Sequence, residues 1–175
     1  YGGDVTRRAQ FAIEIIRRTK ETAGDDLPLS CRINGADNVR GGLTVADAKA
    51  IAPMLVAAGL DLISISAGVN GSYPTIIPPY DTPYACYVPL AAAVKSVVNV
   101  PVIAAGRIND PRLAEEILSN GQADLIGMAR ALIADPELPH KAYRGEFDQI
   151  RKCIRCNVCI DAVSYTHLRA HETGR

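Results

Sequence analysis

Three cysteines at regular spacing form the most chemically distinctive stretch of the chain. Cys153, Cys156 and Cys159 lie in "KCIRCNVCI" and are three of the five cysteines among 175 residues. Thiolates at such close spacing can meet on one metal ion or one cluster. Zinc takes four ligands in a tetrahedron, whereas iron–sulfur clusters combine closely spaced cysteines with a more distant one. The spacing alone leaves both kinds of site open.

A second group of chemically suggestive residues follows three apolar runs. Arg32 comes after "LPLSC", Gly106 and Arg107 after "PVIAA", and Ala129 and Arg130 after "DLIGM". Parallel α/β proteins bind ligands where their strands end, glycine lets a ligand approach the backbone, and arginine donates charge-assisted bonds to phosphate. We therefore predict a phosphate-bearing ligand between these segments. The alternative interpretation is that they are ordinary loops.

The position of Arg32 suggests a further role, and two helix starts add to the same region. A fixed cation at the end of a strand suits an anionic electron sink, such as the N1–C2=O edge of a reduced flavin. The alternative for Arg32 is a salt bridge to Asp37 or Asp61. Helices that begin near Asp110 and Arg130 would direct backbone N–H groups toward a phosphate.

Alternating helices and strands must position these residues. The apolar periodicity predicts helices over residues 5–20, 44–59, 88–98, 110–121 and from 130 onward, and strands over 27–33, 60–68, 100–106 and 123–129. Thr44 with Asp47 predicts a capping box, and Pro53 predicts a kink or a late helix start. Strands that are apolar on both faces and alternate with helices are typical of a parallel sheet. Four strands could form an open doubly wound sheet, whereas a complete (β/α)₈ barrel needs about twice this length, and the spacing alone does not decide between them.

The overall composition narrows the class of protein. Apolar residues make up 48% and the formal net charge is zero, which argues against a nucleic-acid or anionic-membrane partner. The chain has no apolar run long enough to span a bilayer, and "YGGDVTRRAQ" does not have the pattern of a signal peptide. A cytoplasmic location is therefore expected, where clustered cysteines favour metal or redox chemistry. Cys31 and Cys86 are isolated and are expected to be small buried residues.

Several motifs occur together in the order known from one family. "CRING", "GGLTVADA", "PVIAAGRI", "ADLIGMARALIADPEL" and "CIRCNVCI" follow an initial "YGG" with Arg8 and Phe11. From Tyr1 to about Ala162 the chain resembles the C-terminal half of the Old Yellow Enzyme-like NADH:flavin oxidoreductases, in the subgroup of 2,4-dienoyl-CoA reductase and trimethylamine dehydrogenase. The resemblance implies an α/β fold, an incomplete (β/α)₈ TIM barrel holding about strands 5–8 with their helices. The first four strands are expected to be absent.

The resemblance also assigns cofactors and residue roles. It implies FMN, NAD(P)H as co-substrate, and a small-molecule substrate that is an enone, an enoyl-CoA or an amine. Arg32 would contact the flavin ring, while Gly106 with Arg107 and Ala129 with Arg130 would form the two halves of the FMN phosphate loop. No oligomeric state is predicted.

The cysteines would hold a [4Fe–4S] cluster in this family. Cys153, Cys156 and Cys159 would be three of its ligands, and a fourth cysteine, expected about a dozen residues later, is absent from the chain. In the family, the substrate-binding His or Asn pair and the usual proton-donating Tyr come from the first half of the barrel, so no catalytic acid is predicted here. The loop tyrosines expected to line the pocket are Tyr73, Tyr80, Tyr84 and Tyr87.

The sequence is expected to divide into three segments, and two alternative functions remain open. Residues 1–150 would be the half-barrel, 151–162 the cysteine segment, and 163–175 a non-native or disordered tail whose His167 and His171 are weak candidates for metal ligands. One alternative function is a phosphate-binding barrel lyase or isomerase with a structural zinc site. The other is a half-barrel without activity of its own.

Overall fold

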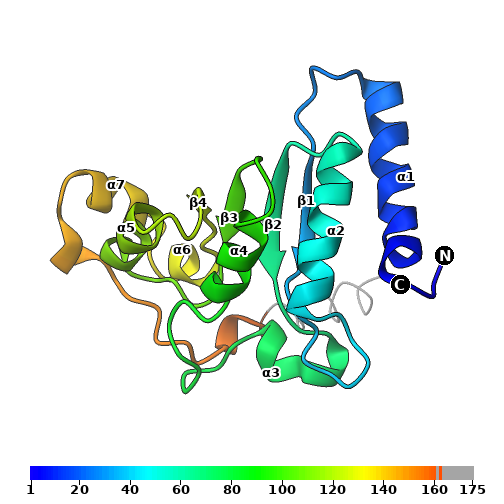
Figure 1. The fold of residues 1–175 in the computed structure, drawn as a ribbon. Coiled ribbons are helices and arrows are strands. Elements are labelled where there is room, and N and C mark those ends of the chain that lie inside the picture. Colours follow the sequence, from blue (N-terminus) through cyan, green and yellow to red (C-terminus); the bar gives the residue numbers. More distant parts are fainter. Residues whose placement is uncertain (161, 163–175) are drawn as a thin grey trace, which may run out of the picture.

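Four parallel strands form one sheet in the computed structural model, which describes residues 1–160 and 162 (Figure 1). The strands are β1 (Ser30–Asn34), β2 (Leu62–Ser66), β3 (Val102–Ala104) and β4 (Leu125–Ile126). Their order in the sheet, β1-β2-β3-β4, is the order of the chain. Because every strand pair is parallel, all four strands end along the same edge of the sheet.

Helices connect each strand to the next one in the sheet. Helix α1 (Val5–Ala23) precedes β1, α2 (Val45–Ala57) and α4 (Val88–Lys95) form the next two crossovers, and α5 (Pro111–Ser119) leads to β4. Figure 1 shows α1 and α2 side by side. The remaining elements are η1 (Asn70–Ser72), α3 (Tyr73–Ile76), α6 (Arg130–Ala134), α7 (Leu138–Tyr143) and η2 (Phe147–Gln149).

The larger of two apolar clusters in the described structure joins the sheet to helices α1, α2, α4 and α5. Its fully buried large side chains include Leu55 of α2, Ile63 and Ile65 of β2, Val94 of α4, and Val102 of β3. Burying one such aliphatic side chain contributes about 1.5–3 kcal/mol. The core therefore fixes the strands and leaves their carboxyl ends free to carry functional residues.

Helix α2 begins with the capping box that the sequence predicts. The Thr44 hydroxyl accepts a bond from the backbone N–H of Asp47, and the Asp47 carboxylate accepts from the backbone N–H of Thr44. Two otherwise unpaired N–H groups at the helix start are satisfied in this way. The helix starts at Val45 and Pro53 lies inside it, so the alternative of a late start is wrong.

The helix predicted from residue 130 onward is interrupted at Asp135. Helix α6 ends at Ala134 and α7 begins at Leu138, and the buried Asp135 carboxylate lies at the break. It accepts bonds from Lys141 Nζ at 2.7 Å and from the backbone N–H of Glu137 and Arg151. The Lys141 bond is the main reason that the pKa of Asp135 is lowered. These bonds join α7 to the segment that leads into the cysteines.

Other boundaries also differ from the sequence prediction. Strands β3 and β4 are shorter than predicted, and the loop over residues 69–87 contains η1 and α3. Cys31 and Cys86 are expected to be buried, but the structure shows that both are only partly buried. Among the described residues, no helix has both the length and the apolar character needed to cross a bilayer.

Candidate functional site

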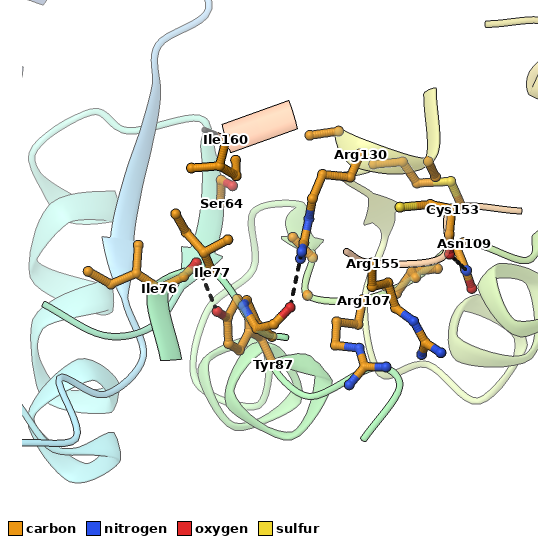
Figure 2. A pocket seen from close by; sticks show the side chains of 18 of the residues that line it. Ser64, Ile76, Ile77, Tyr87, Arg107, Asn109, Arg130, Cys153, Arg155 and Ile160 are labelled. Atoms are coloured by element: carbon orange, nitrogen blue, oxygen red, sulfur yellow. Dashed lines mark hydrogen bonds between the residues drawn. The ribbon is translucent and has the colours of Figure 1, made fainter. Parts of the chain in front are cut away.

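A pocket of about 380 Å³ opens where the strands end (Figure 2). Strands β1 and β2 contribute Arg32 and Ser64 to its wall, and the turns after β3 and β4 contribute most of the rest. The segment after α7 closes one side with Cys153 and Arg155. The volume lies within the range of small-molecule sites, which is about 300–1,000 Å³.

The charge of this pocket is strongly one-sided. Its lining includes Arg32, Arg107, Arg130 and Arg155 but no Asp or Glu among the described residues. None of these four arginines forms a salt bridge within the described part of the chain. Because the chain as a whole has a net charge of zero, the pocket concentrates positive potential. A ligand that carries negative charge is the complementary occupant.

Arg107 is the most unusual of the four arginines, because it is buried and incompletely bonded. Arg107 is 7% exposed, and its Nη2 donates to the carbonyl of Tyr80 at 2.8 Å. Its guanidinium carbon lies 5.2 Å from the centroid of the Tyr84 ring. Nε and Nη1 are buried without a partner in the described structure. Buried N–H groups of a cation are costly when unpaired, so this side chain is suited to receive an anion.

Gly106 brings the backbone of the same turn close to an aromatic ring. Its φ is +95°, and a Cβ atom there would lie 2.6 Å from the ring of Tyr87. The Tyr87 hydroxyl donates to the carbonyls of Thr75 and Ile76, and burial raises the pKa of Tyr87 to about 12. The phenol therefore stays neutral and holds its ring against the turn, where only glycine fits.

Ala129 and Arg130 follow β4 in the chain and also line the pocket. Ala129 is the N-cap of α6 and no side chain caps that helix. Arg130 Nη1 donates to the carbonyl of Pro78 at 3.0 Å (Figure 2). It also donates to the side-chain oxygen of Asn157. Arg130 thus links the pocket to the middle of the cysteine segment.

Arg32 has no carboxylate partner in the described structure. The Asp37 carboxylate accepts bonds from the Asn34 side chain and the Leu43 backbone, and Asp61 pairs with Lys20 at 2.6 Å. The alternative of a structural salt bridge for Arg32 is therefore wrong. Arg32 is an exposed residue in the middle of β1, and its side chain remains available to a ligand in the pocket.

The start of α5 is one of the two helix starts expected to contact a phosphate. The Asp110 carboxylate accepts from the backbone N–H of Arg112 and from Lys152 Nζ at 2.7 Å. The Lys152 bond is the first cause of the lowered pKa of Asp110. One N–H group of this helix start is therefore already paired with a carboxylate, and the expected phosphate contact with α5 stays a prediction.

The cysteine segment packs on the pocket rather than apart from it. The Cys153 carbonyl accepts a bond from Asn109 Nδ2 at 3.2 Å, and Arg155 lies over the Tyr84 ring at 4.4 Å. Cys153 and Cys159 are partly buried and Cys156 is exposed. The spacing of the cysteines predicts a role as metal ligands. Nothing in the sequence indicates that Arg155 faces the ligand pocket.

The thiols do not form a metal centre in the described structure. No three Cys, His, Asp or Glu side chains gather as a potential metal site within residues 1–160 and 162. The arrangement therefore does not fit a complete four-ligand cluster, and the cluster stays a prediction. The tail prediction for residues 163–175, with His167 and His171, lies outside the described residues.

The four loop tyrosines divide into different roles. Tyr87 lines the pocket, Tyr84 supports two guanidinium groups, and Tyr80 contributes its backbone carbonyl. Tyr73 is largely exposed and is not among the lining residues. Only part of the predicted tyrosine lining therefore faces the pocket.

Comparison with known proteins identifies the family. The sequence model of the NADH:flavin oxidoreductase / NADH oxidase family matches residues 1–149. The chain belongs to this family. An NADH oxidase from Thermoanaerobacter brockii is 45% identical over 170 residues, which are 97% of this chain and 26% of that protein. The chain thus spans about a quarter of the length of this curated relative.

Solved structures agree with the fold. A 2-naphthoyl-CoA reductase matches with a TM-score of 0.83 and 36% identity over 89% of this chain and 24% of that one. An old yellow enzyme homologue from Zymomonas mobilis matches with a TM-score of 0.61 and 21% identity, over 83% of this chain and 39% of that one. The likeness confirms both the family resemblance and the predicted fold class, part of a (β/α)₈ TIM barrel.

Proposed function

We propose that the chain forms the FMN-binding part of an NAD(P)H-dependent flavin oxidoreductase. The observation that carries the proposal is Arg107, a buried cation with two unpaired nitrogens in a pocket without acidic side chains. A phosphate supplies the acceptors that such a side chain lacks. Membership of a flavin oxidoreductase family favours this function over the phosphate-binding lyase or isomerase.

Each predicted cofactor residue then has a physical role. Arg107 and Arg130 donate to phosphate oxygens, and Gly106 and Ala129 let the backbone approach the ligand without a large side chain. Arg32 places a fixed positive charge near the electron-rich edge of the flavin ring. When bound, FMN supplies hydride transfer, and the protein positions it and tunes its electronics. No residue of this chain is proposed as a catalytic acid.

The substrate is proposed to be a small molecule whose activated double bond accepts a hydride. An enone or an enoyl-CoA has this chemistry, and the 2-naphthoyl-CoA reductase that the chain resembles is named for an acyl-CoA substrate. An amine is the alternative, which would reduce the flavin. Anaerobic mixing separates the two classes, because an amine bleaches the oxidised flavin whereas an enone reoxidises the reduced form.

We further propose that Cys153, Cys156 and Cys159 supply three thiolates to a [4Fe–4S] cluster whose fourth ligand lies elsewhere. Arg155 and Asn157 have left-handed backbones, with φ of 64° and 61°, and so turn the chain on both sides of Cys156. Backbone turns of this general kind occur at iron–sulfur sites. The alternative occupant is a structural zinc ion.

An anaerobic visible absorption spectrum with metal analysis tests both cofactors in the full-length protein. We expect flavin bands on a broad iron–sulfur background. Cys156→Ser should lose iron and keep flavin, whereas Cys31→Ser, a partly buried thiol on β1, should keep both. A colourless protein that binds no added FMN would refute the flavin proposal. Zinc without iron would refute the cluster alone.

A further inference from the structure

Two arginines from distant segments meet on one aromatic ring. Arg107 follows β3, Arg155 lies between Cys153 and Cys156, and their guanidinium carbons lie 5.2 and 4.4 Å from the centroid of Tyr84. Figure 2 shows the two side chains on the same wall of the pocket. Each cation can interact favourably with the face of the ring, but the ring removes no net charge.

Both guanidinium groups have the same unsatisfied atoms. Nε and Nη1 of Arg107 and of Arg155 are buried and have no hydrogen-bond partner in the described structure. No carboxylate lines the pocket among those residues. Two cations in one pocket whose nitrogens have lost water without gaining acceptors are costly. A doubly charged anion with several acceptor oxygens supplies both the opposite charge and the missing bonds.

We propose that Arg155 completes the phosphate subsite of the flavin together with Arg107. The inference rests on the proposed function and extends it, because it makes the cysteine segment part of the cofactor site. Both residues have left-handed backbones, with φ of 58° and 64°. This conformation is uncommon outside glycine and is consistent with positions that a ligand site requires.

A resident cofactor fits this subsite better than a co-substrate. Phosphate groups also occur on NADPH and on CoA thioesters, but these molecules leave after each turnover. Their departure would return both buried guanidinium groups of Arg107 and Arg155 to the unpaired state. A flavin phosphate that stays bound offsets their desolvation permanently.

Flavin binding to the full-length protein tests the role of Arg155. The flavin-free protein is titrated with FMN and with riboflavin, which lacks the phosphate, and flavin fluorescence is followed. We expect Arg155→Gln to raise the Kd for FMN about ten- to hundredfold, the range of one or two charge-assisted bonds. The Kd for riboflavin should not change. Arg151→Gln removes the same charge from an exposed position of the same segment and should alter neither Kd.

The other possible outcomes of the titrations show whether the role of Arg155 fails alone or together with the proposed function. If the unchanged protein binds no FMN, the proposed function fails and the inference fails with it. If it binds FMN and Arg155→Gln binds equally well, only the role of Arg155 is refuted. A parallel loss of riboflavin affinity would make Arg155 merely structural and also overturn the inference. So would unchanged FMN affinity with a raised KM for NADPH relative to NADH, since the anion would then belong to the co-substrate.

Discussion

Replacing Arg107 by Met should separate stability from cofactor binding. In the flavin-free protein the change removes two buried nitrogens, Nε and Nη1, that have no hydrogen-bond partner, and each costs about 1–3 kcal/mol. It also removes one bond to the Tyr80 carbonyl, worth about 1 kcal/mol, and a contact with Tyr84 of about 0.5–2 kcal/mol. The gain of about 2–6 kcal/mol exceeds the loss of about 1.5–3 kcal/mol over most of these ranges. We therefore expect the free energy of unfolding to stay unchanged or to rise, by up to about 4 kcal/mol.

The same change should have a large effect on FMN affinity. Two charge-assisted bonds from Nε and Nη1 of Arg107 to a phosphate are together worth about 3 kcal/mol or more. Their loss corresponds to an increase in the Kd for FMN of at least about a hundredfold. A residue that costs stability when empty and contributes affinity when filled belongs to a binding site rather than to the scaffold.

Urea unfolding and flavin titration of the full-length protein measure the two effects separately. Unfolding is followed by far-ultraviolet circular dichroism without flavin, and the Kd comes from fluorescence. Arg17→Met removes the same charge from an exposed position on α1 and should change neither quantity. The reasoning is refuted if Arg107→Met lowers the flavin-free stability by more than about 2 kcal/mol, or if FMN affinity is retained.

Two further predictions concern the turn after β3 and an ion pair near β2. Gly106→Ala should destabilise the protein by about 2–4 kcal/mol, because its Cβ would lie 2.6 Å from the Tyr87 ring and its φ is +95°. Gly121→Ala, with φ of +66° and nothing within 4 Å of the added Cβ, should cost only about 1–2 kcal/mol in urea unfolding; equal costs would contradict the ring contact. The bond from Lys20 lowers the pKa of Asp61 below 3.8, so its stabilisation is present above that value and lost as the pH falls through the folded pKa. Asp61→Asn should therefore reduce the fall in Tm between about pH 5 and about pH 3, and an unchanged pH profile would contradict this assignment.

Local sequence signals predicted most of the fold. Thr44 and Asp47 mark the start of α2 because their capping bonds join residues three apart. The break at Asp135 was missed because its bonds to Lys141 and Arg151 come from later elements. A local pattern records the bonds of a residue to its neighbours, and long-range bonds leave no periodic signal.

The residues of the candidate site also fall into those that the sequence could predict and those that it could not. Gly106 and Arg107 could be predicted because they follow an apolar strand, and strand ends meet at one edge of a parallel sheet. The position of Arg155 could not be predicted, because its contact in the pocket is with the ring of Tyr84, a residue of the distant β2–α4 loop. The regular spacing of the cysteines identifies three possible ligands, but only the path of the chain decides whether their sulfur atoms converge.

The sequential strand order has a consequence for synthesis. Each strand pairs with the one made just before it, so the sheet can grow as the polypeptide leaves the ribosome. The proposed phosphate site is different, because Arg107, Arg130 and Arg155 come from the later part of the chain. A nascent chain that has built β1, β2 and β3 therefore lacks Arg155 and Arg130. We expect tight cofactor loading to follow the emergence of the cysteine segment, so that a ribosome stalled before it carries a folded sheet without a retained flavin.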